Sequence, residues 1–205
     1  MSIVLFPASL RQESHQLRLA RHLSAVIAPH CRTDIVLPGD VALPLYNPDI
    51  EAEPQWRSRV EALHERFAAA DGVVVLTPEH NGQVSAYLKN TVDWLSRLPR
   101  LDDRFAGAGA FKDMPILLAG ATTGWSGTLL ALRDARALFA YVGGFVCAEQ
   151  ICVSDADQWQ YGDSYVFEDA FAGHIAGVAE RFVQMCARHS GTDLARTVLP
   201  APKVA

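Results

Sequence analysis

The chain has 205 residues, of which 50% are apolar and 20% are charged, and its formal net charge is −5. This composition is close to that of an average globular protein and excludes a disordered, collagen-like or disulfide-scaffold chain. The acidic balance argues against a general nucleic-acid binder, because no basic surface dominates. The length suits one compact domain with elaborated loops, large enough to bury a core without disulfides or metals.

Targeting and redox signals indicate a cytoplasmic protein. The first residues have no basic segment ahead of their short apolar run, so they do not resemble a secretory signal. No stretch approaches the roughly 18 continuous apolar residues of a membrane span. The four cysteines form no C-x-x-C pair, which favours buried, reduced thiols, and the seven histidines do not cluster. We therefore expect neither a metal site nor a membrane partner.

Apolar runs alternate with helical patterns in the first part of the chain. Residues 2–6 and 34–37 predict buried strands, separated by a polar loop at 8–14 and a helix that ends near Pro29. Residues 41–53 contain too many turn formers to be regular.

The middle of the chain continues the alternation. Pro54 suits the first turn of a helix, and the spacing of the apolar residues extends this helix to Phe67. Residues 72–77 predict the clearest strand, and a long helix is expected at 83–98. Residues 99–113 predict an irregular connection.

The last part of the chain predicts two more strands and two more helices. The strands are expected at 115–120 and 144–153, on either side of a helix at 127–140. A final helix carries an apolar stripe from Phe167 to Met185.

Five strands that alternate with helices and consist of near-continuous apolar runs predict an α/β fold. We expect a doubly wound five-stranded parallel sheet with helices on both faces. Residues 1–190 would form this single domain, and 191–205 a loose tail. Ligands bind outside the carboxyl ends of the strands in such folds, which directs attention to the loops at 8–14, 78–82 and 121–127.

The loop after the first strand contains Ser9, Arg11 and Ser14 just before a helix begins. The unpaired N–H groups and partial positive charge of a helix N-terminus suit a phosphate, which serine hydroxyls and a guanidinium can also bind. The alternative is that Ser14 only caps the helix and Arg11 is solvated. Because the patterns G-x-G-x-x-G and G-K-[ST] are absent, a phosphate here would be a terminal monoester, as in a mononucleotide.

The loop after the third strand and the helix that follows carry the most specific motif. Residues 77–97 read T-P-E-H-N-G-Q-V-S-A-Y-L-K-N-T-V-D-W-L-S-R. This pattern closely resembles the NADPH-dependent FMN reductase family, a flavodoxin-like group of azo-, quinone- and chromate-reducing flavoproteins. The spacing of Ser9-Leu10-Arg11 and Ser14, the L-P-L-Y-N at 43–47 and the G-W-S-G at 124–127 resemble other segments of that family, in the same order.

The resemblance implies a flavodoxin-like fold that binds FMN, with NADPH or NADH as electron donor. By position, three groups of residues would contact the cofactor. Its phosphate would be held by Ser9, Arg11, Ser14 and Gln16; its isoalloxazine ring would be lined by Pro78, Glu79, His80, Asn81 and Gly82; and its pyrimidine edge would be approached by Thr122, Thr123 and Gly124. The chain departs from the family at Ala8, Gln16 and His80, where glycine, asparagine and tyrosine are common.

The long helix carries two apolar rows, one with Leu88 and Val92 and the other with Tyr87 and Trp94. If one row faces the sheet, the other exposes a large aromatic side chain unless a partner covers it. This favours a homodimer or homotetramer, which the resemblance also implies. The alternative is a single broad face turned toward the core.

The preferred function is an enzyme whose FMN accepts a hydride from NAD(P)H and passes electrons to a planar small-molecule acceptor, such as a quinone, an azo compound or another flavin. Because the cofactor carries the chemistry, no catalytic triad is expected. Trp125 is placed to touch the flavin or the acceptor, whereas Trp159 either flanks the site or pins its loop to the body. The alternatives are a flavodoxin-like electron carrier without its own substrate and a flavin-free interaction protein of the same fold.

Overall fold

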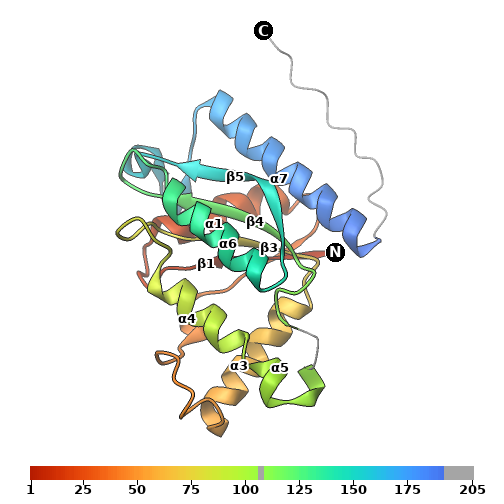
Figure 1. Cartoon of the computed structure of the whole chain (residues 1–205). Helices are drawn as coiled ribbons and strands as arrows, with labels where there is room; N and C mark the ends of the chain where they lie inside the picture. Colours follow the sequence, from red (N-terminus) through yellow and green to blue (C-terminus); the bar gives the residue numbers. More distant parts are fainter. Residues whose placement is uncertain (106–108, 192–205) are drawn as a thin grey trace.

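A computed structural model describes residues 1–105 and 109–191 of the chain. Its centre is a parallel sheet with the strand order β2-β1-β3-β4-β5 (Figure 1). The strands are β1 (Ser2–Pro7), β2 (Arg32–Ile35), β3 (Gly72–Leu76), β4 (Pro115–Ala121) and β5 (Phe145–Val153). The predicted fold class, a doubly wound five-stranded parallel sheet, is therefore confirmed.

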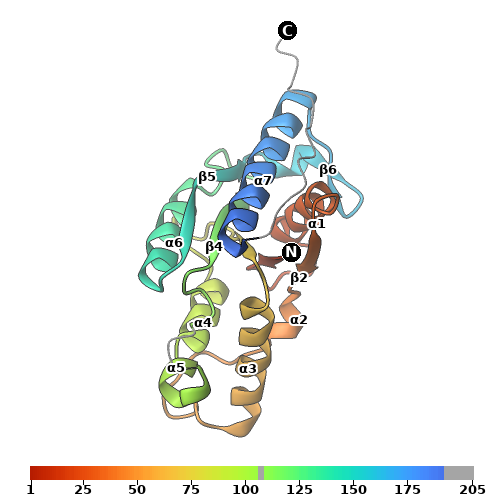
Figure 2. The ribbon, with the colours of Figure 1, turned by 90° about the vertical axis from the view of Figure 1, so that its right-hand side faces the viewer.

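Helices cover both faces of the sheet, as Figure 2 shows. One face packs against α1 (His15–Ile27) and α7 (Asp169–Ser190), and the other against α3 (Pro54–Ala68), α4 (Ala86–Leu95) and α6 (Leu129–Tyr141). Successive side chains point to opposite faces, so β1 sends Val4 and Phe6 to one core and Ile3 and Leu5 to the other. All residues of β3 and β4 are buried, which explains their continuous apolar sequences.

Most predicted boundaries agree with the structure within two residues, and the second strand is shifted by two residues at both ends. It lies at Arg32–Ile35 instead of 34–37, because the chain turns into the short helix α2 (Pro38–Val41). Pro38 has no N–H to donate to a sheet and suits the first turn of a helix. The apolar run therefore extends beyond the strand itself.

The long helix predicted at 83–98 is shorter than expected, since α4 covers only Ala86–Leu95. It begins later because Ser85 caps it, with Oγ accepting a backbone N–H of the first turn at 3.1 Å. It ends earlier because Pro99 lies in the first turn of a separate short helix, α5 (Leu98–Leu101). The helical periodicity was correct, but it did not reveal these two interruptions.

Both apolar rows of α4 pack against the core of the chain itself, and Tyr87 is half-buried there. Leu88 and Val92 belong to the core, and Trp94 is only 1% exposed. The indole N–H of Trp94 donates to the Pro44 carbonyl at 2.8 Å, and its ring packs edge-on against Tyr46. The chain's own loop thus covers this aromatic side chain. The predicted exposed row is wrong, and the helix instead presents the broad core face, so α4 gives no support for a homodimer.

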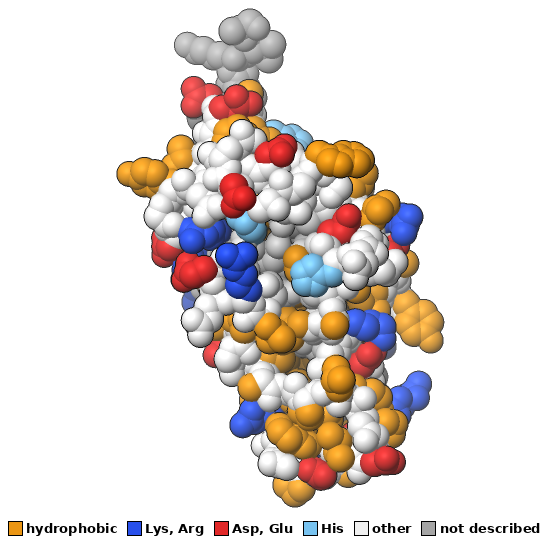
Figure 3. Space-filling view, turned by 90° about the vertical axis from the view of Figure 1, so that its left-hand side faces the viewer, with side chains coloured by type: hydrophobic (Ala, Val, Ile, Leu, Met, Phe, Trp, Pro, Cys, Tyr) orange, Lys and Arg blue, Asp and Glu red, His pale blue; other side chains and the backbone are white. Residues whose placement is uncertain are grey.

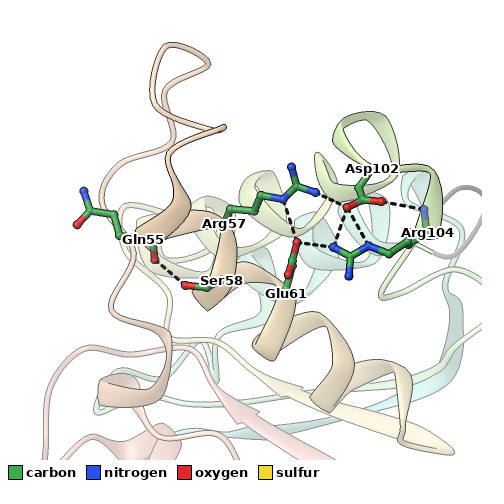
Figure 4. Close-up of polar contacts among 6 residues, drawn as sticks. All are labelled: Gln55, Arg57, Ser58, Glu61, Asp102 and Arg104. Carbon is green, nitrogen blue, oxygen red and sulfur yellow. Dashed lines mark hydrogen bonds and ion pairs between the residues drawn. The ribbon is translucent and has the colours of Figure 1, made fainter.

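The connection after α4 is tied to α3 by a network of ion pairs (Figure 4). It contains α5 and the 3₁₀ turn η1 (Asp103–Phe105). Arg57 and Arg104 each pair with both Glu61 and Asp102. Hydrogen bonds from Arg104 lower the pKa of Asp102 to about 2, so the network keeps its charges well below neutral pH.

The carboxyl-terminal part of the described chain ends with α7. Phe167 lies just before this helix and is nevertheless buried, and Gly191 ends the helix with a φ of 69°. Of the predicted tail at 191–205, residues 192–205 lie outside the described residues. Within 1–105 and 109–191, no helix is long and apolar enough to span a membrane, and no cluster of His, Cys, Asp or Glu could hold a metal ion.

Candidate functional site

The loops after β1, β3 and β4 meet at the carboxyl edge of the sheet, on the left of Figure 1. Because β3 lies between β1 and β4, its loop lies between the other two. Figure 3 looks onto this edge, where Lys, Arg and His side chains lie around the middle and hydrophobic side chains gather below them. We call the segments 8–14, 77–83 and 122–127 loop one, loop two and loop three.

Loop one leads from β1 into α1 with polar side chains at the edge. The Ala8 N–H donates to the Leu76 carbonyl at 2.7 Å and holds the start of the loop against β3. Arg11 is exposed, and its guanidinium makes no ion pair with any described residue. The Ser9 Oγ accepts only a long contact, 3.4 Å, from the Arg11 N–H. Both side chains are available to an anion.

Ser14 caps α1, which confirms the capping role considered from the sequence. Its Oγ accepts the Leu17 N–H at 3.1 Å. The hydroxyl proton is not used in that contact, so the same side chain can still donate to an anion. The N–H groups of His15 and Gln16 have no acceptor within the helix, and the first turn contains no acidic residue. Hydroxyls, free N–H groups and a guanidinium together fit a phosphate.

Gln16 lies beneath this donor set and is only 3% exposed. Its Nε2 donates to the Ala121 carbonyl at 2.8 Å, and its Oε1 accepts the Ala121 N–H at 3.0 Å. On this side of β4 the pairing with β3 has already ended. The amide of Gln16 takes the place of a neighbouring strand and bonds the last residue of β4. The side chain therefore ties α1 to the end of β4, and both of its polar atoms are engaged away from the phosphate position that the resemblance implies.

Loop two contains a tight two-residue turn. His80 and Gln83 exchange backbone hydrogen bonds of 3.1 and 3.0 Å around Asn81 and Gly82. The φ values of Asn81 and Gly82 are 54° and 74°, the geometry of a type I′ turn, for which Asn-Gly is the preferred sequence. His80 and Asn81 are exposed at the edge, whereas Pro78 at the start of the loop is half-buried.

Close packing fixes loop two against its neighbours. The Ser85 hydroxyl donates to the Ala8 carbonyl at 2.7 Å and so joins the start of α4 to loop one. At Gly120 a Cβ would lie 2.0 Å from Thr128 Oγ1 and 2.7 Å from the Thr77 carbonyl, so only glycine fits there. These contacts fix the base of loop two against loop one and against the end of β4.

Loop three is held by the segment that follows β5. The Thr122 N–H donates to the Val153 carbonyl at 2.9 Å, and the Ala156 N–H donates to the Thr122 carbonyl at 3.0 Å. Thr123 and Gly124 are exposed. Trp125 is 89% exposed, so its ring is available to a planar molecule at this edge.

Glu79 differs from the other loop-two residues that the resemblance places at a flavin ring. Its carboxylate accepts hydrogen bonds from two backbone N–H groups in the first turn of α6 and from a loop-three hydroxyl. Glu79 thus joins loop two to loop three. Neither this role nor that of Gln16 leaves a signal in the sequence, because the partners lie 51 and 105 residues away.

A small hairpin covers the start of α1, in the segment between β5 and α7. Its strands, β6 (Gln160–Tyr161) and β7 (Ser164–Tyr165), follow the 3₁₀ turn η2 (Ala156–Trp159). His15 shares a 2.7 Å hydrogen bond with the Tyr165 hydroxyl, and Arg18 donates to the Gly162 carbonyl. In the sequence, this contact is marked only by polar residues at helical spacing on α1, His15 and Arg18.

Trp159 packs against Phe167 and Phe171, with ring centroids 5.7 and 6.3 Å away. Of the two roles considered from the sequence, the structure shows that Trp159 pins its loop to the body. Together with the hairpin, these rings fix the segment that supports loop three.

Acidification is expected to loosen the hairpin. Burial lowers the pKa of His22, whose Nδ1 donates to the Tyr165 carbonyl at 3.2 Å. Burial also lowers the pKa of His15, against the opposing charge of Asp157. The folded-state pKa values lie below the unfolded value of 6.5. The two neutral histidines therefore contribute their full share to the free energy of unfolding above that pH. This contribution to stability is lost as the pH falls through 6.5 toward the lowered pKa values.

Urea unfolding at about pH 7.5 and about pH 5.5 measures this loss. We expect a lower midpoint at the acidic pH and a smaller difference for His22→Phe, whose ring no longer takes up a proton. The exposed His174→Phe serves as the control and is expected to keep the wild-type difference. An equal difference in His22→Phe and wild type would contradict the role of His22.

Comparisons with known proteins agree with the geometry of this edge. The sequence model of the NADPH-dependent FMN reductase family matches residues 1–158. The chain is 36% identical over 146 residues to the quinone reductase of Escherichia coli (strain K12), covering 71% of this chain and 73% of that protein. It is 30% identical over 142 residues to the 2-hydroxy-1,4-benzoquinone reductase of a Burkholderia species, covering 69% of this chain and 72% of that protein.

A solved structure shows the same fold. FerB, a flavoenzyme NAD(P)H:(acceptor) oxidoreductase from Paracoccus denitrificans, matches with a TM-score of 0.75 at 24% identity, over 92% of this chain and 98% of that one. The family match spans all three loops at the carboxyl edge. The resemblance inferred from the motifs is thus confirmed, and the chain belongs to the NADPH-dependent FMN reductase family.

Proposed function

We propose that this protein is an FMN-dependent oxidoreductase that takes a hydride from NADPH or NADH and reduces a quinone. Membership of the family supports the use of FMN and NAD(P)H, and the quinone reductases among its relatives support the acceptor. One observation carries the proposal. Hydrogen-bond donors suited to a phosphate and an exposed tight turn meet at the same edge of the sheet. When bound, FMN supplies the hydride and electron chemistry, and the chain positions it.

Loop one and the first turn of α1 would hold the phosphate of FMN. Ser9 and Ser14 donate through their hydroxyls, and Arg11 can reach two phosphate oxygens in a fork. The free N–H groups of His15 and Gln16 add the partial positive charge of the helix N-terminus. The Gln16 side chain acts from below by fixing α1 to β4.

Loops two and three would seat the isoalloxazine ring. Pro78, His80, Asn81 and Gly82 line one side, and Thr122, Thr123 and Gly124 approach the pyrimidine edge. The N–H groups of Asn81 and Gly82 donate to no acceptor in the described part of the chain. They are therefore available to stabilise negative charge on a bound ring.

We also propose a cytoplasmic homodimer or homotetramer that needs no nucleic-acid partner. The resemblance supports the assembly, and exposed large apolar side chains, such as Leu45 and Trp125, are of the kind that a second subunit buries. The net charge of −5 argues against nucleic acid.

Oxidation of NADPH or NADH in the presence of a benzoquinone tests the proposed activity. We expect continuous oxidation only when the protein, FMN and the quinone are all present, so each is omitted in turn as a control. Uptake of FMN without oxidation of either nucleotide would indicate an electron carrier. A failure to take up FMN would indicate a flavin-free interaction protein.

A further inference from the structure

The N-terminus of α6 has no cap of its own. Its N-cap residue, Thr128, has a left-handed backbone with φ 67°, and its side chain accepts no hydrogen bond from the helix. The Thr128 hydroxyl instead donates to the Gly127 carbonyl at 2.5 Å. The first turn of α6 also contains no acidic residue. Its free N–H groups therefore need an acceptor from elsewhere in the chain.

Glu79 of loop two supplies this acceptor. Its Oε2 accepts the N–H groups of Leu130 at 3.0 Å and Ala131 at 3.2 Å. Its Oε1 lies 3.4 Å from the donating hydroxyl of Ser126, in loop three. The negative charge is favoured at this place by the dipole of α6, and hydrogen bonds to a carboxylate are stronger than those to a neutral acceptor.

The contact joins the two loops that would seat the flavin ring. Glu79 lies between Pro78 and the Asn81-Gly82 turn, so its carboxylate fixes the turn relative to loop three. At the base of the loops, Gly120 packs closely against Thr77 and Thr128. The Glu79 carboxylate adds a link from loop two to Ser126 of loop three and to the first turn of α6.

We propose that Glu79 is a positioning residue, whose carboxylate sets the separation of loops two and three and thereby the affinity for FMN. This inference rests on the proposed function, since it assumes that the two loops seat the flavin ring. Glu79 acts through α6 and Ser126, and its side chain does not touch the reacting atoms.

Glu79→Gln tests the proposal because it keeps the length of the side chain and replaces one acceptor oxygen by an NH₂ group. The remaining oxygen can still accept from the two α6 N–H groups, whereas the NH₂ group cannot accept from the Ser126 hydroxyl, so the variant loses the negative charge and the hydrogen bond that Ser126 donates. We expect the dissociation constant for FMN to rise about 10-fold, as for the loss of a charge-assisted hydrogen bond. Glu61→Gln is the matched control: it removes the same charge from a half-buried carboxylate whose ion pairs, to Arg57 and Arg104, involve none of the three loops (Figure 4).

A second variant separates positioning from simple stabilisation of α6. Leu129 is the first residue of α6 and is exposed, so Leu129→Glu places a carboxylate at the same helix terminus without linking the loops. In the double variant Glu79→Gln/Leu129→Glu, we expect the thermal midpoint of the flavin-free protein to recover and the FMN affinity to remain low. Leu129→Glu alone corrects for any direct effect of the added charge.

Fluorescence titration with FMN gives the affinities. Recovery of FMN affinity in the double variant would show that Glu79 only stabilises the helix and would overturn the proposal, as would wild-type affinity in Glu79→Gln. A wild-type protein that takes up no FMN would instead contradict the proposed function. The two failures are therefore distinguishable.

Discussion

Trp94→Ala is expected to lower the free energy of unfolding by about 3–5 kcal/mol, the range for truncating a buried tryptophan. The ring is 1% exposed and packs against Tyr46. The Pro44 carbonyl, which accepts the indole N–H, also accepts the Asn90 Nδ2 at 2.8 Å and so keeps a partner in the variant. The loss is therefore mainly one of packing. Urea unfolding of the flavin-free protein measures it, with the exposed Trp125→Ala as a control expected to change stability by about 0.5 kcal/mol or less.

Light scattering on the same variant tests where Trp94 lies in the assembly. Because the side chain is covered by its own chain, we expect Trp94→Ala and wild type to form particles of the same mass under conditions where both are folded. Dissociation into 22.4 kDa chains with little loss of stability would instead place Trp94 in a subunit interface.

Arg11→Ala is expected to raise the dissociation constant for FMN about 100-fold. Two charge-assisted hydrogen bonds at about 1.5 kcal/mol each correspond to roughly this factor. Arg11 has no carboxylate partner among the described residues, so its removal leaves no other group unpaired. Arg11→Lys keeps the charge but loses the planar fork, and we expect an intermediate affinity.

Riboflavin provides the control for this experiment, because it has the ring but lacks the phosphate. We expect Arg11→Ala to bind riboflavin as well as wild type does. An equal loss of affinity for riboflavin and FMN would mean that Arg11 acts on the ring or on the fold, and not on the phosphate.

The fold was predictable because its main signals are local. The continuous apolar sequences of β3 and β4 reflect burial on both faces of a parallel sheet, and Pro54 marks the start of α3. The extent of α4 was not predictable from periodicity, since apolar residues at helical spacing continue across the Ser85 cap and into α5. The hairpin of β6 and β7 was also missed, because its strands have two residues each.

The place of the candidate site was predictable from topology, but the roles of individual side chains were only partly so. The carboxyl ends of parallel strands share one edge, which brings loops one, two and three together. Capping by Ser14 could be considered from the sequence as the alternative to phosphate binding, because a cap acts within four residues. Gln16 and Glu79 bond to groups brought near only by the folded sheet, at Ala121 and at the first turn of α6. The burial of Trp94 was missed for the same reason, because the loop that covers it is distant in the sequence.

Binding of FMN at the carboxyl edge of the sheet is tested most directly by titrating FMN into the flavin-free wild-type protein. We expect the flavin fluorescence and the visible absorbance band to change until one FMN is bound per chain, and the same titration of Arg11→Ala to saturate only at much higher concentration. An unchanged flavin spectrum in the presence of excess wild-type protein at micromolar concentration would contradict FMN binding, and with it the proposed oxidoreductase activity.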